Sequence, residues 1–169
     1  MEGKIVNRVA KSKLVTIELD DLYPEGKRTI LDISQWLFQG LVVREKEFRS
    51  QLQDHDWEQY KDDYVVLTCS TDAIIPGWAY LLITTYLQPY AKFVVQGSIA
   101  DLDNLLMEQA INELDVSEYE GKPVIIAGCS NKPIPETSYL LLLQKLMPVA
   151  RNIMFGEACS TVPLFRNRK

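Results

Sequence analysis

The sequence predicts an α/β protein with a mainly parallel sheet and helices on both faces. Two short runs, residues 64–68 and 124–127, are continuously apolar and rich in β-branched side chains, which is typical of strands covered on both faces. Each run is followed by a loop, a proline and a helical pattern, and these two arrangements match each other along the chain. Strands that alternate with helices imply right-handed crossovers and therefore parallel strands.

The chain contains an internal repeat, which we place at about 36–95 and 93–155. The alignment allows one deleted residue and matches short groups in register: Cys69-Ser70 with Cys129-Ser130, Ile75-Pro76 with Ile134-Pro135, Tyr80-Leu81-Leu82 with Tyr139-Leu140-Leu141, and Gly97 with Gly156. Matched groups of this kind are harder to obtain by chance than single leucines or prolines. We therefore predict two tandem strand–helix–strand–helix units.

The remaining elements are predicted in chain order. Residues 14–19 and 29–33 read as strands, and the Pro24-Glu25-Gly26 turn between them predicts an N-terminal hairpin in the segment 1–35. Apolar spacing predicts further helices and strands at 44–52, 77–88, 93–95, 99–114, 136–147 and 153–155. Residues 156–169 are expected to form a C-terminal loop and tail. One α/β domain is expected to account for the chain.

Composition excludes several classes of protein. The chain has 169 residues, 47% of them hydrophobic and 24% charged, and a formal net charge of -5. These values are typical of a globular protein with one core, and the acidic balance argues against a nucleic-acid partner. The most apolar run, residues 73–87, is interrupted by Pro76 and Gly77 and is shorter than the roughly 18 residues that suggest a membrane span. We expect a cytoplasmic protein, without a membrane partner, whose three cysteines are reduced.

The three cysteines form the candidate site. Cys69 and Cys129 each follow a predicted buried strand, and Cys159 follows the last repeated strand by a short loop. The carboxyl edge of a parallel sheet is where loops converge and ligands bind, so all three thiols could share one rim if their strands are neighbours. Helix N-termini near that rim would favour the thiolate form.

A thiolate cluster suggests metal chemistry. Three thiolates can hold zinc or part of an iron–sulfur cluster, and Asp72 and Glu157 are the nearest acidic candidates for a further ligand. A role in sulfur handling is the related expectation. No Cys-x-x-Cys pair supports this interpretation, and each cysteine alone is as readily explained by packing.

Two alternatives from other classes stay open. In the first, Ser70, Ser130 and Ser160 bind a small anionic ligand together with backbone N–H groups, and the thiols only pack. In the second, the protein is a homodimeric interaction partner with structural cysteines. Catalytic residues stay unassigned, because His55 is the only histidine and lies far from the predicted rim, and no phosphate-binding glycine loop is present.

Three stretches of the sequence resemble a known family: Trp36-Leu37-Phe38-Gln39-Gly40-Leu41, Cys69-Ser70-Thr71-Asp72-Ala73-Ile74-Ile75-Pro76 and Gly156-Glu157-Ala158-Cys159-Ser160-Thr161-Val162-Pro163. The family is an uncharacterised one from Bacteroidetes, known as a domain of unknown function, and the resemblance covers nearly the whole chain. Its genes often lie near those for SUF-type iron–sulfur cluster assembly. The resemblance implies a cytoplasmic accessory role with iron–sulfur assembly proteins as partners, and it transfers no catalytic residues.

Overall fold

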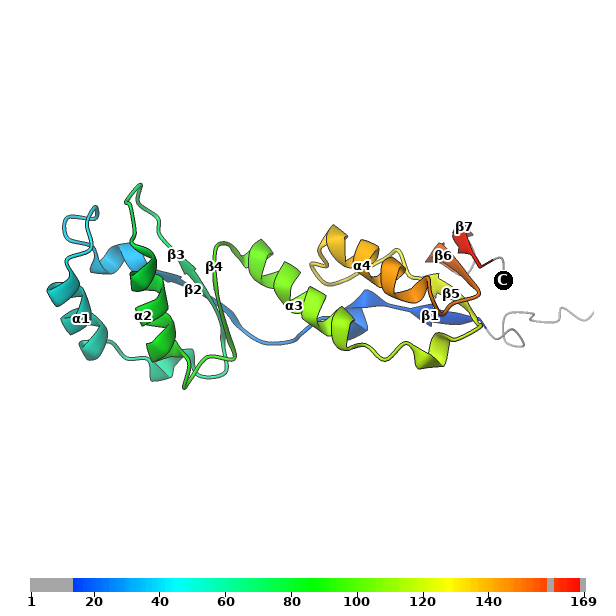
Figure 1. Ribbon diagram of the computed structural model, residues 1–169, viewed down its shortest axis with the longest axis horizontal. Coiled ribbons are helices and arrows are strands. Elements are labelled where there is room, and N and C mark those ends of the chain that lie inside the picture. The colour runs from blue at the N-terminus through cyan, green and yellow to red at the C-terminus, as the bar shows by residue number, and fades with distance from the viewer. Residues whose placement is uncertain (1–13, 158–159, 168–169) are drawn as a thin grey trace, which may run out of the picture. The chain divides into compact units, whose positions relative to one another are not determined.

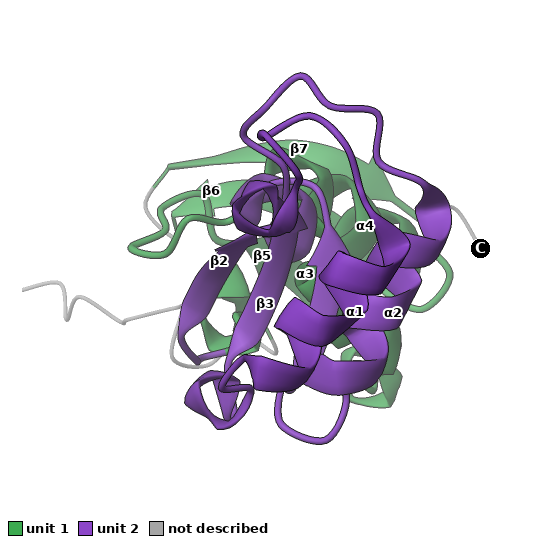
Figure 2. Cartoon of the chain, turned by 90° about the vertical axis from the view of Figure 1, so that its left-hand side faces the viewer, with its two compact units in different colours: residues 1–24, 104–169 green, residues 25–103 purple. Residues whose placement is uncertain are grey.

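The computed structural model describes residues 14–157 and 160–167, and this chain divides into two compact units (Figure 2). Unit 2 is the continuous stretch 25–103, and unit 1 takes residues up to 24 and from 104 onward. The boundary between them falls inside helix α3 (Ile99–Glu113). Each unit has its own sheet and its own buried cluster, so the described residues form two sheets where the sequence predicted one.

Unit 2 is built around three parallel strands in the order β2-β3-β4 (Figure 1). The strands are β2 (Arg28–Asp32), β3 (Tyr64–Thr68) and β4 (Phe93–Gln96). Helix α1 (Glu45–Asp54) connects β2 to β3, and α2 (Gly77–Leu87) connects β3 to β4. The central strand β3 is the 64–68 run, whose three middle residues are buried, as expected for a strand covered on both faces.

The core of unit 2 lies between its two helices and one face of the sheet. Alternate residues of β3, Val65 and Leu67, pack with Phe48 of α1 and with Ile83 and Leu87 of α2, and all five are almost completely buried. The opposite face carries Val66, which is also buried, and Arg28, whose guanidinium donates to Asp103 of α3 at 3.2 Å. On this opposite face Ile30 is 56% exposed, so α1 and α2 both cover the first face of the sheet and leave this one partly open.

Unit 1 also has three parallel strands, and it has a fourth strand that is antiparallel to them. Its order is β1-β5-β6-β7, and only the β6–β7 pair is antiparallel. The elements of this unit, besides α3, are β1 (Val15–Ile17), β5 (Pro123–Ile126), α4 (Glu136–Leu146), β6 (Asn152–Glu157) and β7 (Ser160–Arg166).

The core of unit 1 is assembled in the same way. Val124 and Ile126 of β5 share a buried cluster with Ile111 of α3 and with Leu142 and Leu146 of α4. The ammonium group of Lys145 donates to the carbonyl oxygens of Ile111 (2.7 Å) and Asn112 (2.5 Å). A cation at the C-terminal end of a helix satisfies carbonyl groups that have no partner in the helix, so this contact fixes α4 against the end of α3.

Besides the single sheet, two sequence predictions about the fold are wrong. The N-terminal hairpin does not form, because β1 pairs with β5 and β2 pairs with β3 in a different sheet. The segment 1–35 instead supplies the first strand of each sheet. Residues 160–166 form strand β7, where we predicted a loop and tail.

Other predictions are confirmed. Helices α2 and α4 begin directly after Pro76 and Pro135 and end shortly before Pro89 and Pro148, as the prolines predicted. The described residues form an α/β fold with mostly parallel strands. Among the described residues, no helix is long and apolar enough to cross a membrane. The division of the chain into two repeats and one domain stays a prediction.

Candidate functional site

The first strand of unit 2 ends in an aspartate that organises the neighbouring loop. The carboxylate of Asp32, at the end of β2, accepts hydrogen bonds from the backbone N–H groups of Ser34 (2.9 Å) and Ser70 (3.1 Å). Burial would raise the pKa of Asp32, but the hydrogen bonds from Ser70 and Ser34 outweigh it and lower the pKa to about 2. Asp32 is therefore ionised at neutral pH and holds the loop that follows β3.

Unit 1 has the same arrangement. Asp20, which follows β1, accepts hydrogen bonds from the Ser130 hydroxyl and from the Asn131 backbone N–H at 2.8 Å. The hydrogen bond from Ser130 and then that from Asn131 lower the pKa of Asp20. In both units, an ionised carboxylate at the end of the first strand or shortly after it thus accepts hydrogen bonds from the segment that contains the Cys-Ser pair.

This arrangement disfavours an anion at Ser70 and Ser130. The donors that would bind an anion already point at an internal carboxylate, and the negative charge of Asp32 or Asp20 would repel a second anion. The third serine, Ser160, is the first residue of β7, where it pairs with Glu157 of β6. Anion binding by the serines stays a prediction. In both Cys-Ser loops the described donors already bind Asp32 or Asp20.

A cavity of about 200 Å³ lies at the carboxyl edge of the unit 2 sheet. The ends of β3 and β4, the loop after β3 and the first turn of α2 form its walls, which are lined by Leu67, Thr68, Cys69, Thr71, Ala73, Tyr80, Gln96 and Gly97. The Cys69 thiol lies 3.3 Å from the Thr71 hydroxyl. A thiol, hydroxyl groups and an amide thus face a space large enough for several water-sized groups, each needing about 30 Å³.

Tyr80 and Gln96 give this cavity its hydrogen-bonding character. The Gln96 side chain is hydrogen-bonded to the Tyr80 hydroxyl. Burial, and then negative charge at Cys69 and Asp32, raise the pKa of Tyr80, so its hydroxyl stays protonated at neutral pH and available as a donor or acceptor. The cavity therefore offers neutral polar groups close to one ionised carboxylate.

The corresponding place in unit 1 is filled by an aromatic ring. Phe155 precedes Gly156 at the end of β6 as Gln96 precedes Gly97 at the end of β4, and both glycines have positive φ. The Phe155 ring lies edge-on to Tyr139, with ring centroids 5.8 Å apart. It also packs on Gly128 so closely that a Cβ there would lie 3.1 Å from the ring. Gly128 precedes Cys129 as Thr68 precedes Cys69, so a glycine makes room for the ring that replaces the amide.

Cys129 and Glu157 are the two predicted site residues that the structure brings together. Cys129 is exposed, and its thiol is hydrogen-bonded to the Glu157 side chain. This hydrogen bond and the negative charge of Glu157 raise the pKa of the Cys129 thiol, so the thiolate is disfavoured at neutral pH.

The other predicted metal ligands are not brought together in the described residues. Cys69 and Cys129 follow strands of two different sheets, so the shared sheet edge that we expected does not exist. Asp72 is exposed in the loop before α2, and Cys159 lies outside the described residues. Across residues 14–157 and 160–167, no group of three or more metal-ligating side chains occurs. The cysteines also precede their helices by several residues, so a helix N-terminus does not hold either thiol.

Sequence reasoning missed Thr71, Tyr80 and Gln96 as site residues. Only Gln96 had a signal in the alignment of the two segments, because Phe155 stands at the corresponding position. His55 lies at the end of α1, where its ring packs 4.6 Å from Trp57 and its Nε2 lies 3.1 Å from the Tyr60 hydroxyl. Burial lowers the pKa of His55, and the residue belongs to an aromatic cluster rather than to the cavity.

Comparison with known proteins supplies a family and no function. No curated protein and no solved structure matches the chain. A family model described as a protein of unknown function (DUF2480) matches residues 3–167. The chain therefore belongs to the DUF2480 family.

Proposed function

We propose that the protein binds a small polar molecule in the cavity at the carboxyl edge of the unit 2 sheet. The observation that carries this proposal is the contrast between the units. The same scaffold position holds Gln96 beside an open cavity in unit 2 and a packed Phe155 in unit 1. A filled edge is the more stable solution, so a cavity kept open and lined by polar groups favours a ligand site.

The charges around the cavity favour a neutral or cationic ligand. No aspartate, glutamate, lysine or arginine lines it, and the nearby Asp32 is ionised. An amide, a polyol or an amine could exchange hydrogen bonds with Thr71, Tyr80 and Gln96, whereas a carboxylate would meet the field of Asp32. The cavity is smaller than typical sites for drug-sized ligands, which start at about 300 Å³, so the ligand has few heavy atoms.

A fragment screen tests this proposal. Small amides, polyols, amines and carboxylates are titrated into the full chain and followed by protein NMR. We expect saturable binding of members of the first three classes, which Gln96→Phe abolishes by filling the cavity as Phe155 fills its counterpart. Gln88→Phe places the same side chain at an exposed site on the same unit and is expected to leave binding unchanged. Preferential binding of carboxylates, or equal binding by Gln96→Phe, would contradict the proposal.

A second candidate function is metal binding in unit 1, favoured by the contact between Cys129 and Glu157. A thiol and a carboxylate are both zinc ligands, and a metal ion can replace the proton that they share. These residues supply two donors of the four that a tetrahedral zinc site needs. Cys159, two residues after Glu157 in the sequence, is the predicted third donor; iron–sulfur binding at the same thiols is the other metal expectation.

Zinc titration with variants tests the second candidate. If the site exists, the anaerobic full chain takes up zinc in a one-to-one ratio, and Cys129→Ser and Cys159→Ser abolish this uptake. Cys69→Ser is the matched control, because Cys69 belongs to the other unit, and we expect it to leave uptake unchanged. The absence of stoichiometric zinc or iron under every loading condition would exclude this candidate.

We propose that the two units descend from one duplicated unit, because each has, in the same order, a first strand, an aspartate at its end or shortly after it, a helix, a Cys-Ser loop and a second helix. A cytoplasmic location and an accessory role beside iron–sulfur assembly proteins rest on the family resemblance. Homodimer formation is checked by light scattering.

A further inference from the structure

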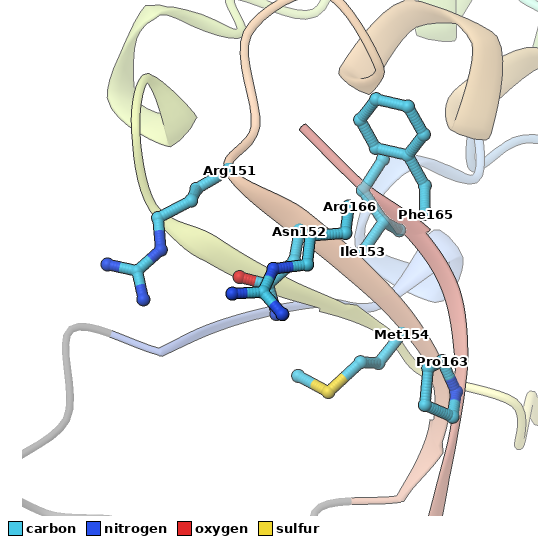
Figure 3. A pocket seen from close by; sticks show the side chains of 7 residues that line it. All are labelled: Arg151, Asn152, Ile153, Met154, Pro163, Phe165 and Arg166. Atoms are coloured by element: carbon cyan, nitrogen blue, oxygen red, sulfur yellow. The ribbon is translucent and has the colours of Figure 1, made fainter. Parts of the chain in front are cut away.

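A second cavity in the structure, of about 240 Å³, belongs to unit 1. It lies at the end of the unit 1 sheet that is opposite to the Cys-Ser loop. It lies where β6 begins and β7 ends, and it is lined by Arg151, Asn152, Ile153, Met154, Pro163, Phe165 and Arg166. Figure 3 shows the guanidinium groups of Arg151 and Arg166 extending toward the same side of the strands, with Asn152 beside Arg166. None of these residues belongs to the sites proposed above.

Strand pairing places these side chains together. Asn152 and Arg166 are directly opposite on the antiparallel β6–β7 pair, so their side chains lie on the same face of the sheet. Ile153 and Phe165, the next pair, point to the other face and pack in the unit 1 core. The backbone of Arg151 is held by two hydrogen bonds of 2.9 and 2.8 Å, one to Lys122 and one from Asn167. The two arginines therefore extend from anchored backbone positions.

The charge in this cavity is not compensated within the described residues. The chain has more acidic than basic residues, yet neither Arg151 nor Arg166 forms an ion pair with any described carboxylate. Four other cations do form such pairs, with Asp63, Asp103, Glu47 and Glu45. Two guanidinium groups that line one cavity repel each other, and a bound anion would remove this cost.

We propose that this cavity binds a small ligand through an oxyanion group, a phosphoryl or dicarboxylate group. The planar forks of two guanidinium groups match the oxygens of phosphate or carboxylate, and the Asn152 amide adds a neutral donor. The Met154 side chain and Pro163 provide an apolar wall for the rest of the ligand. The site is separate from the Gln96 cavity in its unit, in its charge and in its ligand class.

NMR titration of the full chain with inorganic phosphate and, separately, with malonate tests this proposal. We expect saturable shifts centred on Arg151, Asn152 and Arg166 with at least one anion, and the preferred anion identifies the ligand class. Arg151→Gln and Arg166→Gln should each weaken binding about tenfold, the value of one charged hydrogen bond. Arg166→Lys keeps the charge but loses the fork and should also weaken binding. Lys46→Gln removes an exposed cation on α1 and should leave binding unchanged.

A chemical measurement on the unmodified chain makes the test independent of variant folding. Phenylglyoxal modifies accessible arginines, and the preferred anion should slow modification of Arg151 and Arg166 but not of Arg49, which is paired with Glu45. The proposal would be overturned if the NMR shifts rose linearly, without saturation, with both anions. It would also be overturned if Arg166→Gln bound as tightly as the unchanged chain, or if Lys46→Gln weakened binding as much as the arginine variants. Absence of protection by either anion would do the same.

Discussion

Unit 2 and unit 1 have the same plan but differ at the carboxyl edge of their sheets. In both, an ionised aspartate at the end of the first strand or shortly after it holds the Cys-Ser loop, and a tyrosine at the fourth position of the following helix lies beside that loop. In unit 2, Gln96 borders a cavity, whereas in unit 1 Phe155 fills the space over Gly128. The features present in both units are those that hold the fold, and the feature that differs is the candidate for function.

This comparison assigns a structural role to the geometry that the two units share. A Cys-Ser loop in one copy alone would suggest a reactive site. Its presence in both units, with its donors directed at Asp32 or Asp20, indicates a structural role for the serines and for the two carboxylates. Function is then sought where the units differ: at Gln96 in unit 2, and at Glu157 and the additional strand β7, which carries Arg166, in unit 1.

The largest expected effect tests whether the units are separate cores. Leu87 and Leu146 are the last residues of α2 and α4, and both are fully buried in their own cluster. Leu87→Ala should lower the free energy of unfolding of unit 2 by about 2–5 kcal/mol, and Leu146→Ala should do the same in unit 1. Hydrogen exchange read by mass spectrometry should accelerate in β3 peptides for the first variant and in β5 peptides for the second.

The control for this pair is Leu81→Ala, because Leu81 is on α2 but 70% exposed. It should change stability by less than about 0.5 kcal/mol. If Leu87→Ala accelerated exchange equally in β3 and β5, the two clusters would unfold as one, and the comparison of independent units would fail.

The next effect concerns the ring that distinguishes unit 1. Phe155→Gln removes a half-buried ring that contacts Tyr139 and Gly128, so it should destabilise unit 1 by about 2 kcal/mol, less than a fully buried phenylalanine would. The reverse change in unit 2, Gln96→Phe, should cost less because it fills a cavity. Urea unfolding of both variants measures the difference. Equal costs would mean that the two edges are packed alike.

A smaller effect concerns the aspartate that both units share. The pKa of Asp32 is about 2 in the folded chain against 3.8 ordinarily, so its stabilisation is complete above about pH 4 and is lost as pH falls toward 2. Asp32→Asn should reduce stability by about 1 kcal/mol at pH 7 and flatten the loss of stability below pH 4. The variant is needed because Asp63 and Asp101 also have lowered pKa values in this unit. If the stability of Asp32→Asn depended on pH below 4 as that of the unchanged chain does, Asp32 would not stabilise the fold.

Much of the fold was predictable because it depends on local patterns. The apolar runs located β3 and β5, and the prolines located the ends of α2 and α4. The partner of each strand was not predictable, because pairing is decided by distant residues: β1 joins β5 more than 100 residues later along the chain. The turn at Pro24-Glu25-Gly26 looked like a hairpin, but it lies at the boundary between the two units.

The candidate site was only partly predictable for the same reason. The contact between Cys129 and Glu157 follows from the pairing of adjacent strands β5 and β6, and both residues were predicted. The expected meeting of Cys69 with Cys129 required their strands to share a sheet, and they do not. Gln96 and the two arginines have no recognisable motif, so only the structure showed the cavities that they line.

The smallest expected effect leaves the fold intact. It is a difference in reactivity between the thiols of the two Cys-Ser loops, Cys129 and Cys69. The Glu157 side chain raises the pKa of Cys129, so at pH 7 this thiol should react with iodoacetamide more slowly than an ordinary exposed thiol. Glu157→Gln removes the negative charge and should shift the rate–pH curve of Cys129 to lower pH, while the curve of Cys69 in the other unit stays in place. Peptide mass spectrometry follows both residues in one sample. Because only the thiolate attacks, a Cys129 curve unmoved by Glu157→Gln would show that this carboxylate does not control the thiol, and the metal candidate would lose its second donor.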